Sequence, residues 1–270
     1  MKKLSARRRH PLAALVVLLF ALAATGGLYA AFAPAGEAKA EQASSQSLAI
    51  EEGKKLYATG CSSCHGTGGQ GTSDGPSLVG VGSAAVDFQV GTGRMPAQQP
   101  GAQVPEKKKI YSQDEINQLA AYVASLGSGP VTPTKGQYDP SGADVANGGQ
   151  LFRTNCAQCH NFTGEGGALT HGKYAPGLED VAPKHIYEAM QTGPQNMPSF
   201  PDKVLPEQDK RDIAAYLKTV NSKDSEQPGG YKLGGLGPVA EGLFAWIFGL
   251  GALIVVAVWV AARTAKARKS

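Results

Sequence analysis

Cysteine is scarce in this chain of 270 residues, and its four copies fall in two short stretches, CSSCH at 61–65 and CAQCH at 156–160. A zinc site needs four ligands at short spacings, usually from two neighbouring Cys-x-x-Cys pairs, and these pairs lie 95 positions apart. A redox disulfide of the thioredoxin kind needs no histidine after the second cysteine and normally sits in a βαβ context. The sequence therefore argues against both uses of the motif.

Charge is absent from residues 11–33 and 242–262, and each stretch exceeds the roughly 20 apolar residues that cross a bilayer as a helix. A basic tail precedes the first stretch and another follows the second. Because positive flanks stay in the cytoplasm, we expect a multi-pass protein of the cell membrane, in contact with lipid, whose middle part lies on the extracytoplasmic face. A small-x-small site at 31–33 would permit cleavage, but the apolar stretch is long for a signal core, so we expect retention and two cytoplasmic termini.

An excess of basic residues is also missing from the middle of the chain. Residues 34–238 hold 17 basic and 21 acidic side chains, a net charge of −4, and the overall charge of +4 comes from the two tails. This distribution reflects membrane topology and gives no support to nucleic-acid binding.

The remaining use of Cys-x-x-Cys-His is covalent attachment of haem. Both thiols add to the vinyl groups of haem, and the adjacent imidazole ligates the iron from the proximal side. Two copies of the motif predict two haem c groups, held by Cys61 and Cys64 and by Cys156 and Cys159. The proximal iron ligands would be His65 and His160.

The segments around the two motifs repeat. The apolar and glycine positions before the first motif recur 95 residues later, before the second. A later apolar stripe that begins at Leu119 recurs 94 residues later, where it begins at Ile213. The spacings of three and four are helical, so each unit opens and closes with an amphipathic helix and the fold class is all-α. Ser112 with Glu115 forms a capping box, and Pro206 suits the first turn of the second closing helix.

Methionine is as rare as cysteine, yet two of the four copies stand in equivalent Met-Pro steps. Met95 lies thirty residues after His65, and Met197 lies thirty-seven after His160. A thioether suits haem iron and raises its reduction potential, so both are predicted distal ligands, with packing in a core as the alternative. Met190 lies on a predicted helix, where core packing is the better interpretation.

Three further features can be interpreted as ordinary surface or loop residues. The EKKK run at 106–109 is expected to be a solvated face, and His171 and His185 to be surface or loop histidines. Arg94, beside Met95, has two open interpretations, a partner of a haem propionate or a plain surface arginine.

These residues resemble the class I c-type cytochromes, small helical domains with Cys-x-x-Cys-His near the start and an axial methionine in a late loop. In that family the first and last helices cross at a glycine and an aromatic residue, a role that the resemblance gives to Gly53 with Tyr122 and to Gly148 with Tyr216.

The resemblance also implies that a proline carbonyl accepts a hydrogen bond from each ligand imidazole, Pro76 from His65 and Pro176 from His160. Domains of about 80 residues bury little core alone, so we expect each haem to be the centre of its own fold. The chain then divides into a basic tail with a signal or anchor segment (1–33), a linker (34–47), cytochrome domain 1 (48–127), a linker (128–142), cytochrome domain 2 (143–221), a linker (222–238), a transmembrane helix (239–262) and a basic tail (263–270).

Two tandem class I domains with a C-terminal anchor and an N-terminal hydrophobic segment resemble the dihaem cytochrome c subunit of the actinobacterial quinol–cytochrome c reductase, the cytochrome bc complex. The resemblance implies an electron-transfer subunit without turnover of its own, which relays electrons from a Rieske iron–sulfur subunit to a haem–copper cytochrome c oxidase in a supercomplex and also contacts cytochrome b. The alternatives are a cytochrome subunit of another oxidase or dehydrogenase, and a dihaem peroxidase, which needs one exchangeable iron site that the two Met-Pro loops argue against.

Overall fold

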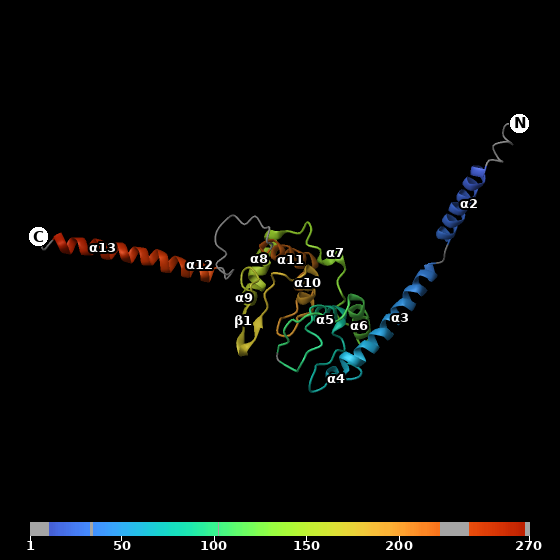
Figure 1. The fold of residues 1–270 in the computed structure, drawn as a ribbon, viewed down its shortest axis with the longest axis horizontal. Coiled ribbons are helices and arrows are strands. Elements are labelled where there is room, and N and C mark those ends of the chain that lie inside the picture. Colours follow the sequence, from blue (N-terminus) through green and yellow to red (C-terminus); the bar gives the residue numbers. More distant parts are fainter. Residues whose placement is uncertain (1–10, 33–34, 102, 222–237, 268–270) are drawn as a thin grey trace, which may run out of the picture. The chain divides into compact units, whose positions relative to one another are not determined.

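The computed structural model describes residues 11–32, 35–101, 103–221 and 238–267, and the chain divides into two units, residues 1–49 and 50–270 (Figure 1). Nearly all of the regular structure is helical, so the predicted all-α class is confirmed. One antiparallel pair of two-residue strands, β1 (Gly167–Ala168) and β2 (Tyr174–Ala175), is the exception in the described part.

The first unit contains helix α2 (Pro11–Phe32) and the start of helix α3 (Ala35–Gly60). Residues 12–31 of α2 are long and apolar enough to cross a membrane, with a mean hydropathy of 2.2. The stretch 34–47, predicted as a linker, is helical from Ala35 onward because α3 continues through it. Alanine, glutamate and glutamine dominate this stretch, and all three favour helix.

The first helical domain of the second unit is built from the end of α3 and three further helices. These are α4 (Ser62–His65), α5 (Gly82–Gly91) and α6 (Gln113–Ser125). The predicted capping box of α6 is present, since Ser112 N–H donates to Glu115 Oε2 at 2.8 Å and Ser112 Oγ accepts from Glu115 N–H. The stripe of α6 is buried in a core made of Tyr57, Val90, Ile116, Leu119, Tyr122 and Val123.

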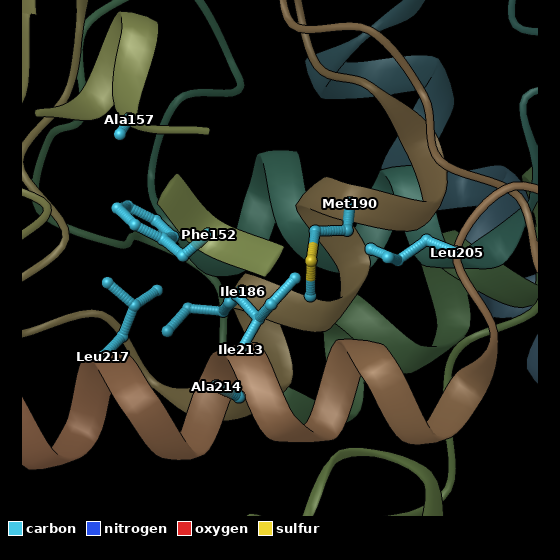
Figure 2. Close-up of a cluster of buried hydrophobic side chains, with 8 residues drawn as sticks. All are labelled: Phe152, Ala157, Ile186, Met190, Leu205, Ile213, Ala214 and Leu217. Carbon is cyan, nitrogen blue, oxygen red and sulfur yellow. The ribbon is translucent and has the colours of Figure 1, made fainter. Parts of the chain in front are cut away.

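The second helical domain repeats this arrangement with more loop structure. Its elements are α8 (Val145–Asn155), α9 (Ala157–His160), β1, η1 (Thr170–Gly172), β2, α10 (Pro183–Thr192) and α11 (Glu207–Asn221). Figure 2 shows the core packed on α11, where Phe152, Ile186 and Met190 lie over Ile213, Ala214 and Leu217. The side chain of Met190 is 3% exposed, which confirms the prediction that it packs in the core.

Close helix crossings at glycine organise both domains. A Cβ added to Gly53 would lie 1.9 Å from Gln118 O and 2.9 Å from Tyr122 Cβ, as the predicted crossing requires. A Cβ added to Gly148 would lie 1.9 Å from Asp212 O. In the second domain the ring of Tyr216 lies against the neighbouring glycine, Gly149, so two glycines share the role that Gly53 fills alone.

The predicted linker 128–142, which contains the short helix α7 (Lys135–Tyr138), is bound at both ends. Pro130 O accepts from Ala84 N–H at 3.1 Å in the first domain, and Asp139 O accepts from Arg211 Nε at 3.0 Å in the second. The two domains also meet directly where α5 faces α10, because Lys184 Nζ is paired with the buried Asp87 carboxylate.

The C-terminal part comprises α12 (Pro238–Phe244), the π-helical stretch η3 (Ala245–Leu250) and α13 (Gly251–Ala267). Residues 239–263 form a second helix able to cross a membrane, with a mean hydropathy of 2.5, which agrees with the predicted transmembrane helix at 239–262. The predicted basic tail at 1–10, the cleavage position at 33, nearly all of the linker 222–238 and the last residues of the tail 263–270 lie outside the described residues.

Candidate haem sites

Each Cys-x-x-Cys-His motif forms one tight helical turn that is separated from the preceding helix by one residue of non-helical backbone. This residue is the first cysteine, with φ −130° at Cys61 between α3 and α4 and φ −121° at Cys156 between α8 and α9. Its carbonyl then accepts from the histidine N–H four residues on, at 3.0 Å from His65 and 2.9 Å from His160. The turn brings two thiols and an imidazole together in the same way in both domains.

Both imidazoles are held by a proline carbonyl. His65 Nδ1–H donates to Pro76 O at 2.8 Å, and His160 Nδ1–H donates to Pro176 O at 3.0 Å, as predicted. A carbonyl acceptor requires the proton on Nδ1, which leaves the lone pair on Nε2 for a metal. Burial lowers the pKa of His160, against the opposing effect of its bond to Pro176, and this favours the neutral form that binds iron.

The first thiol of each motif differs from the attacking thiol of a redox pair. All four cysteines are free in the structure. Burial and the neighbouring Cys64 raise the pKa of Cys61 to about 11, and burial with Cys159 raises that of Cys156 to about 11. A catalytic disulfide needs a thiol whose pKa is lowered, so this geometry agrees with the argument against a thioredoxin-like site.

A cavity of about 720 Å³ adjoins the second motif. Its walls include Cys156, Cys159, His160 and Met197, and its volume lies in the range of cofactor sites. The donor set therefore fits a covalently bound haem: two thiols at the spacing of one helical turn, an oriented neutral imidazole and a soft sulfur.

The two candidate methionines lie in equivalent places on their domains. Met95 packs half-buried against the core of the first domain, and Met197 packs half-buried against the core of the second and lines its cavity. Met190 also borders that cavity, but its side chain is held in the core that Figure 2 shows.

Two residues lie in surroundings that the sequence did not indicate. His185 was expected on the surface, but its Nδ1–H donates at 2.8 Å to Glu188 Oε2, a fully buried carboxylate, and its ring meets Phe88 edge-on at 6.1 Å. Arg94 is buried, which excludes the plain surface interpretation. His185 meets Phe88 of the first domain, and Arg94 lines the cavity beside the second motif, so local sequence patterns carried no signal for either environment. The EKKK run is exposed apart from the half-buried Lys107, close to the prediction.

Comparison with known proteins separates the same two regions. The family described as "Cytochrome c" matches residues 50–127, and the family described as "Cytochrome C oxidase, cbb3-type, subunit III" matches residues 143–217.

Similar proteins extend over almost the whole chain. The "Cytochrome bc1 complex cytochrome c subunit" of Mycobacterium tuberculosis is 47% identical over 264 residues, which are 96% of this chain and 93% of that protein. The protein of the same description from Corynebacterium efficiens is 46% identical over 97% of this chain and 94% of its own. The "Cbb3-type cytochrome c oxidase subunit FixP" of Bradyrhizobium diazoefficiens is 32% identical, but over only 49% of this chain and 46% of its own.

Proposed function

Because the chain belongs to the family of cytochrome c subunits of the cytochrome bc1 complex, an electron-transfer family with covalent haem c, we propose that it carries two haems and relays electrons between them. The observation that carries this proposal is the pair of equivalent turns in which two thiols accompany an imidazole oriented by a proline carbonyl.

Each domain would supply a complete set of ligands. Cys61 and Cys64 would hold the first haem and Cys156 and Cys159 the second, through thioether bonds formed by adding each S–H across a vinyl double bond. Bound haem supplies the reversible one-electron couple of its iron.

The same geometry supports the proposed iron ligands. His65 and His160 would offer Nε2, because each Nδ1 is engaged with a proline carbonyl. Met95 and Met197 would each offer a thioether sulfur as the second iron ligand, which favours the ferrous state. With both positions filled on both irons, no site stays open for oxygen or peroxide, and this favours a relay over the peroxidase alternative.

We further propose the direction and the partners of the relay. Electrons would enter from a Rieske iron–sulfur subunit, with cytochrome b in the same complex, and leave to a haem–copper oxidase associated with it. The two apolar helices would anchor the chain with both termini in the cytoplasm and the haem domains outside, since basic residues flank both helices on that side. The partial likeness to an oxidase subunit supports only the shared cytochrome domains, because it covers half of the chain.

Haem counting tests the proposal directly. Acid-acetone extraction followed by a pyridine haemochrome assay should leave two haems per chain, and the double variant Cys156→Ser/Cys159→Ser should leave one. A value near one in the unmodified protein would refute the dihaem assignment.

Methionine substitution tests the axial ligands. Met95→Leu and Met197→Leu should each keep two covalent haems, lose half of the long-wavelength absorbance of methionine-ligated ferric haem and begin to bind carbon monoxide. Met190→Leu is the matched control, and it should keep the full long-wavelength absorbance and not bind carbon monoxide. Carbon monoxide binding and peroxide consumption by the unmodified protein would favour the peroxidase instead.

A further inference from the structure

The segment of the first domain that begins at Arg94 forms one wall of the cavity in the second domain. Arg94, Gln103, Val104 and Glu106 line this cavity together with the second Cys-x-x-Cys-His turn. Arg94 directly precedes Met95, the proposed ligand of the first haem, so one short stretch of chain borders both sites.

Arg94 brings a poorly compensated charge into this wall. Its side chain is about one-tenth exposed, and its guanidinium carbon lies 4.9 Å from the centre of the Phe88 ring. The nearest carboxylate in the described structure is that of Glu106, 3.7 Å from Nη1, and the Glu106 side chain is 61% exposed. Burial lowers the pKa of Arg94, but a guanidinium stays charged at every physiological pH. A buried cation with one distant, solvated partner favours a second anion.

The same segment binds both loops that would place the axial ligands of the second haem. Gln103 Nε2 donates to Tyr174 O at 2.6 Å while its Oε1 accepts from Tyr174 N–H at 3.0 Å, two residues before Pro176. Val104 N–H donates to Gln195 Oε1 at 3.0 Å while Val104 O accepts from Gln195 Nε2 at 3.1 Å, two residues before Met197. Each pair is reciprocal, so the position of the segment against the second domain is fixed.

We propose that the first domain completes the second haem site, with Arg94 as the partner of a propionate carboxylate of the haem on Cys156 and Cys159. The inference rests on the proposed function, since it needs haem at that site. A haem carries two carboxylates on its edge, and the guanidinium fork matches a carboxylate with two parallel hydrogen bonds. A positive charge beside the haem disfavours the ferric state, so Arg94 would raise the potential of the second haem.

Redox titration of the full-length dihaem protein tests this assignment. The second haem is identified as the one whose potential falls in Met197→Leu. Arg94→Gln should keep two haems per chain and lower the potential of the second haem while the first is unchanged. Lys108→Gln is the matched control, because it removes one positive charge from an exposed side chain of the same segment, and it should shift neither potential. A fall confined to the first haem, or no fall at all, overturns the proposal.

A second variant keeps the test decisive if Arg94→Gln accumulates poorly. Arg94→Met keeps an apolar side chain of similar length and removes the charge, so the potential of the second haem should fall as in Arg94→Gln. An unchanged potential of the second haem also overturns the proposal. These failures differ from failure of the proposed function, which would appear as fewer than two haems in the unmodified chain.

Discussion

The two cytochrome domains share their packing and differ in the loops that face each other. In both, a glycine N–H donates to the carbonyl of the motif histidine, from Gly71 at 2.7 Å and from Gly166 at 3.0 Å. The path from histidine to proline spans 11 residues in the first domain and 16 in the second, where it includes the strand pair β1–β2. That longer path carries Tyr174, which Gln103 of the first domain binds through two hydrogen bonds.

This difference shows that a sequence repeat predicts the same fold for both domains but does not predict the same surroundings for their two sites. What each domain needs for its own core is repeated, because helix crossing and histidine orientation demand the same contacts twice. What joins the domains appears once, since only one face of each can meet the other. The predictions below test first the shared part and then the part that differs.

The largest effect is expected at the glycine crossings, which both domains share. Gly53→Ala and Gly148→Ala each force a Cβ to within 1.9 Å of a backbone carbonyl oxygen that cannot rotate away. Each substitution should cost about 3 kcal/mol or more of folding free energy. Chemical denaturation followed by haem absorbance measures the loss. Gly136→Ala is the control, because nothing lies within 4 Å of its added Cβ, and its stability should not fall. A small loss at one crossing only would show that the two domains are not packed alike.

The next effect is expected at the ion pair between the domains. Lys184 Nζ pairs with Asp87 and lies 3.8 Å from Glu188 Oε1, and both carboxylates are buried. Lys184→Met would leave two buried carboxylates without their cation, which costs up to about 3 kcal/mol, below the range of a fully buried pair because the Lys184 side chain is 25% exposed. Thermal unfolding measures the change.

Two companion variants sharpen this result. Lys55→Met breaks an exposed pair with Glu52 and should leave the unfolding temperature unchanged. Adding Asp87→Asn to Lys184→Met removes one of the stranded charges and should recover part of the loss. A double variant less stable than the single one would contradict the role of Lys184 as counter-ion.

Much of each domain followed from its own sequence. The sequence predicted the closing-helix stripes, the Ser112 cap and the proline carbonyls that orient the motif histidines, because each depends on residues a few turns apart or on a likeness to a known family. The burial of Arg94 and the contact of His185 with Phe88 were not predicted, since both depend on how the two domains meet. The helix through 35–47 was missed for a different reason. Small polar residues suggested a linker, while their helix propensity favoured continuation of α3.

A smaller effect is expected at Gln103, and in the second domain alone. Gln103→Ala removes two hydrogen bonds from the Tyr174 backbone, worth together about 1 to 2 kcal/mol. Hydrogen exchange should accelerate at the Tyr174 amide and its neighbours, while the core helices of the first domain keep their protection. The control is Gln113→Ala, whose side chain makes an exposed bond within α6. Equal acceleration in both domains would mean that Gln103 is not a specific contact to the second.

The smallest effect is the pH dependence that Glu188 gives to stability. Its carboxyl is fully buried, Oε2 accepts from His185, and Oε1 has no hydrogen-bond partner among the described residues. Burial raises the pKa of Glu188 above its usual 4.5, and Asp87 adds to the rise, while the bond to His185 and the charge of Lys184 oppose it.

The direction of this change in stability with pH follows from proton binding by the folded and unfolded chains. Between 4.5 and the raised value the folded chain binds the proton more tightly than the unfolded chain, so Glu188 lowers stability as pH rises through this window, by no more than about 1.4 kcal/mol per pH unit. Glu188→Gln keeps an acceptor for His185 and leaves Lys184 paired with Asp87, but it cannot ionise. Denaturation of both proteins across pH should give similar stabilities below pH 4.5 and an advantage for the variant that grows between pH 4.5 and the raised pKa and is constant above it. Parallel curves would show that Glu188 keeps an ordinary pKa, and that its ion pairs offset its burial where the two domains meet.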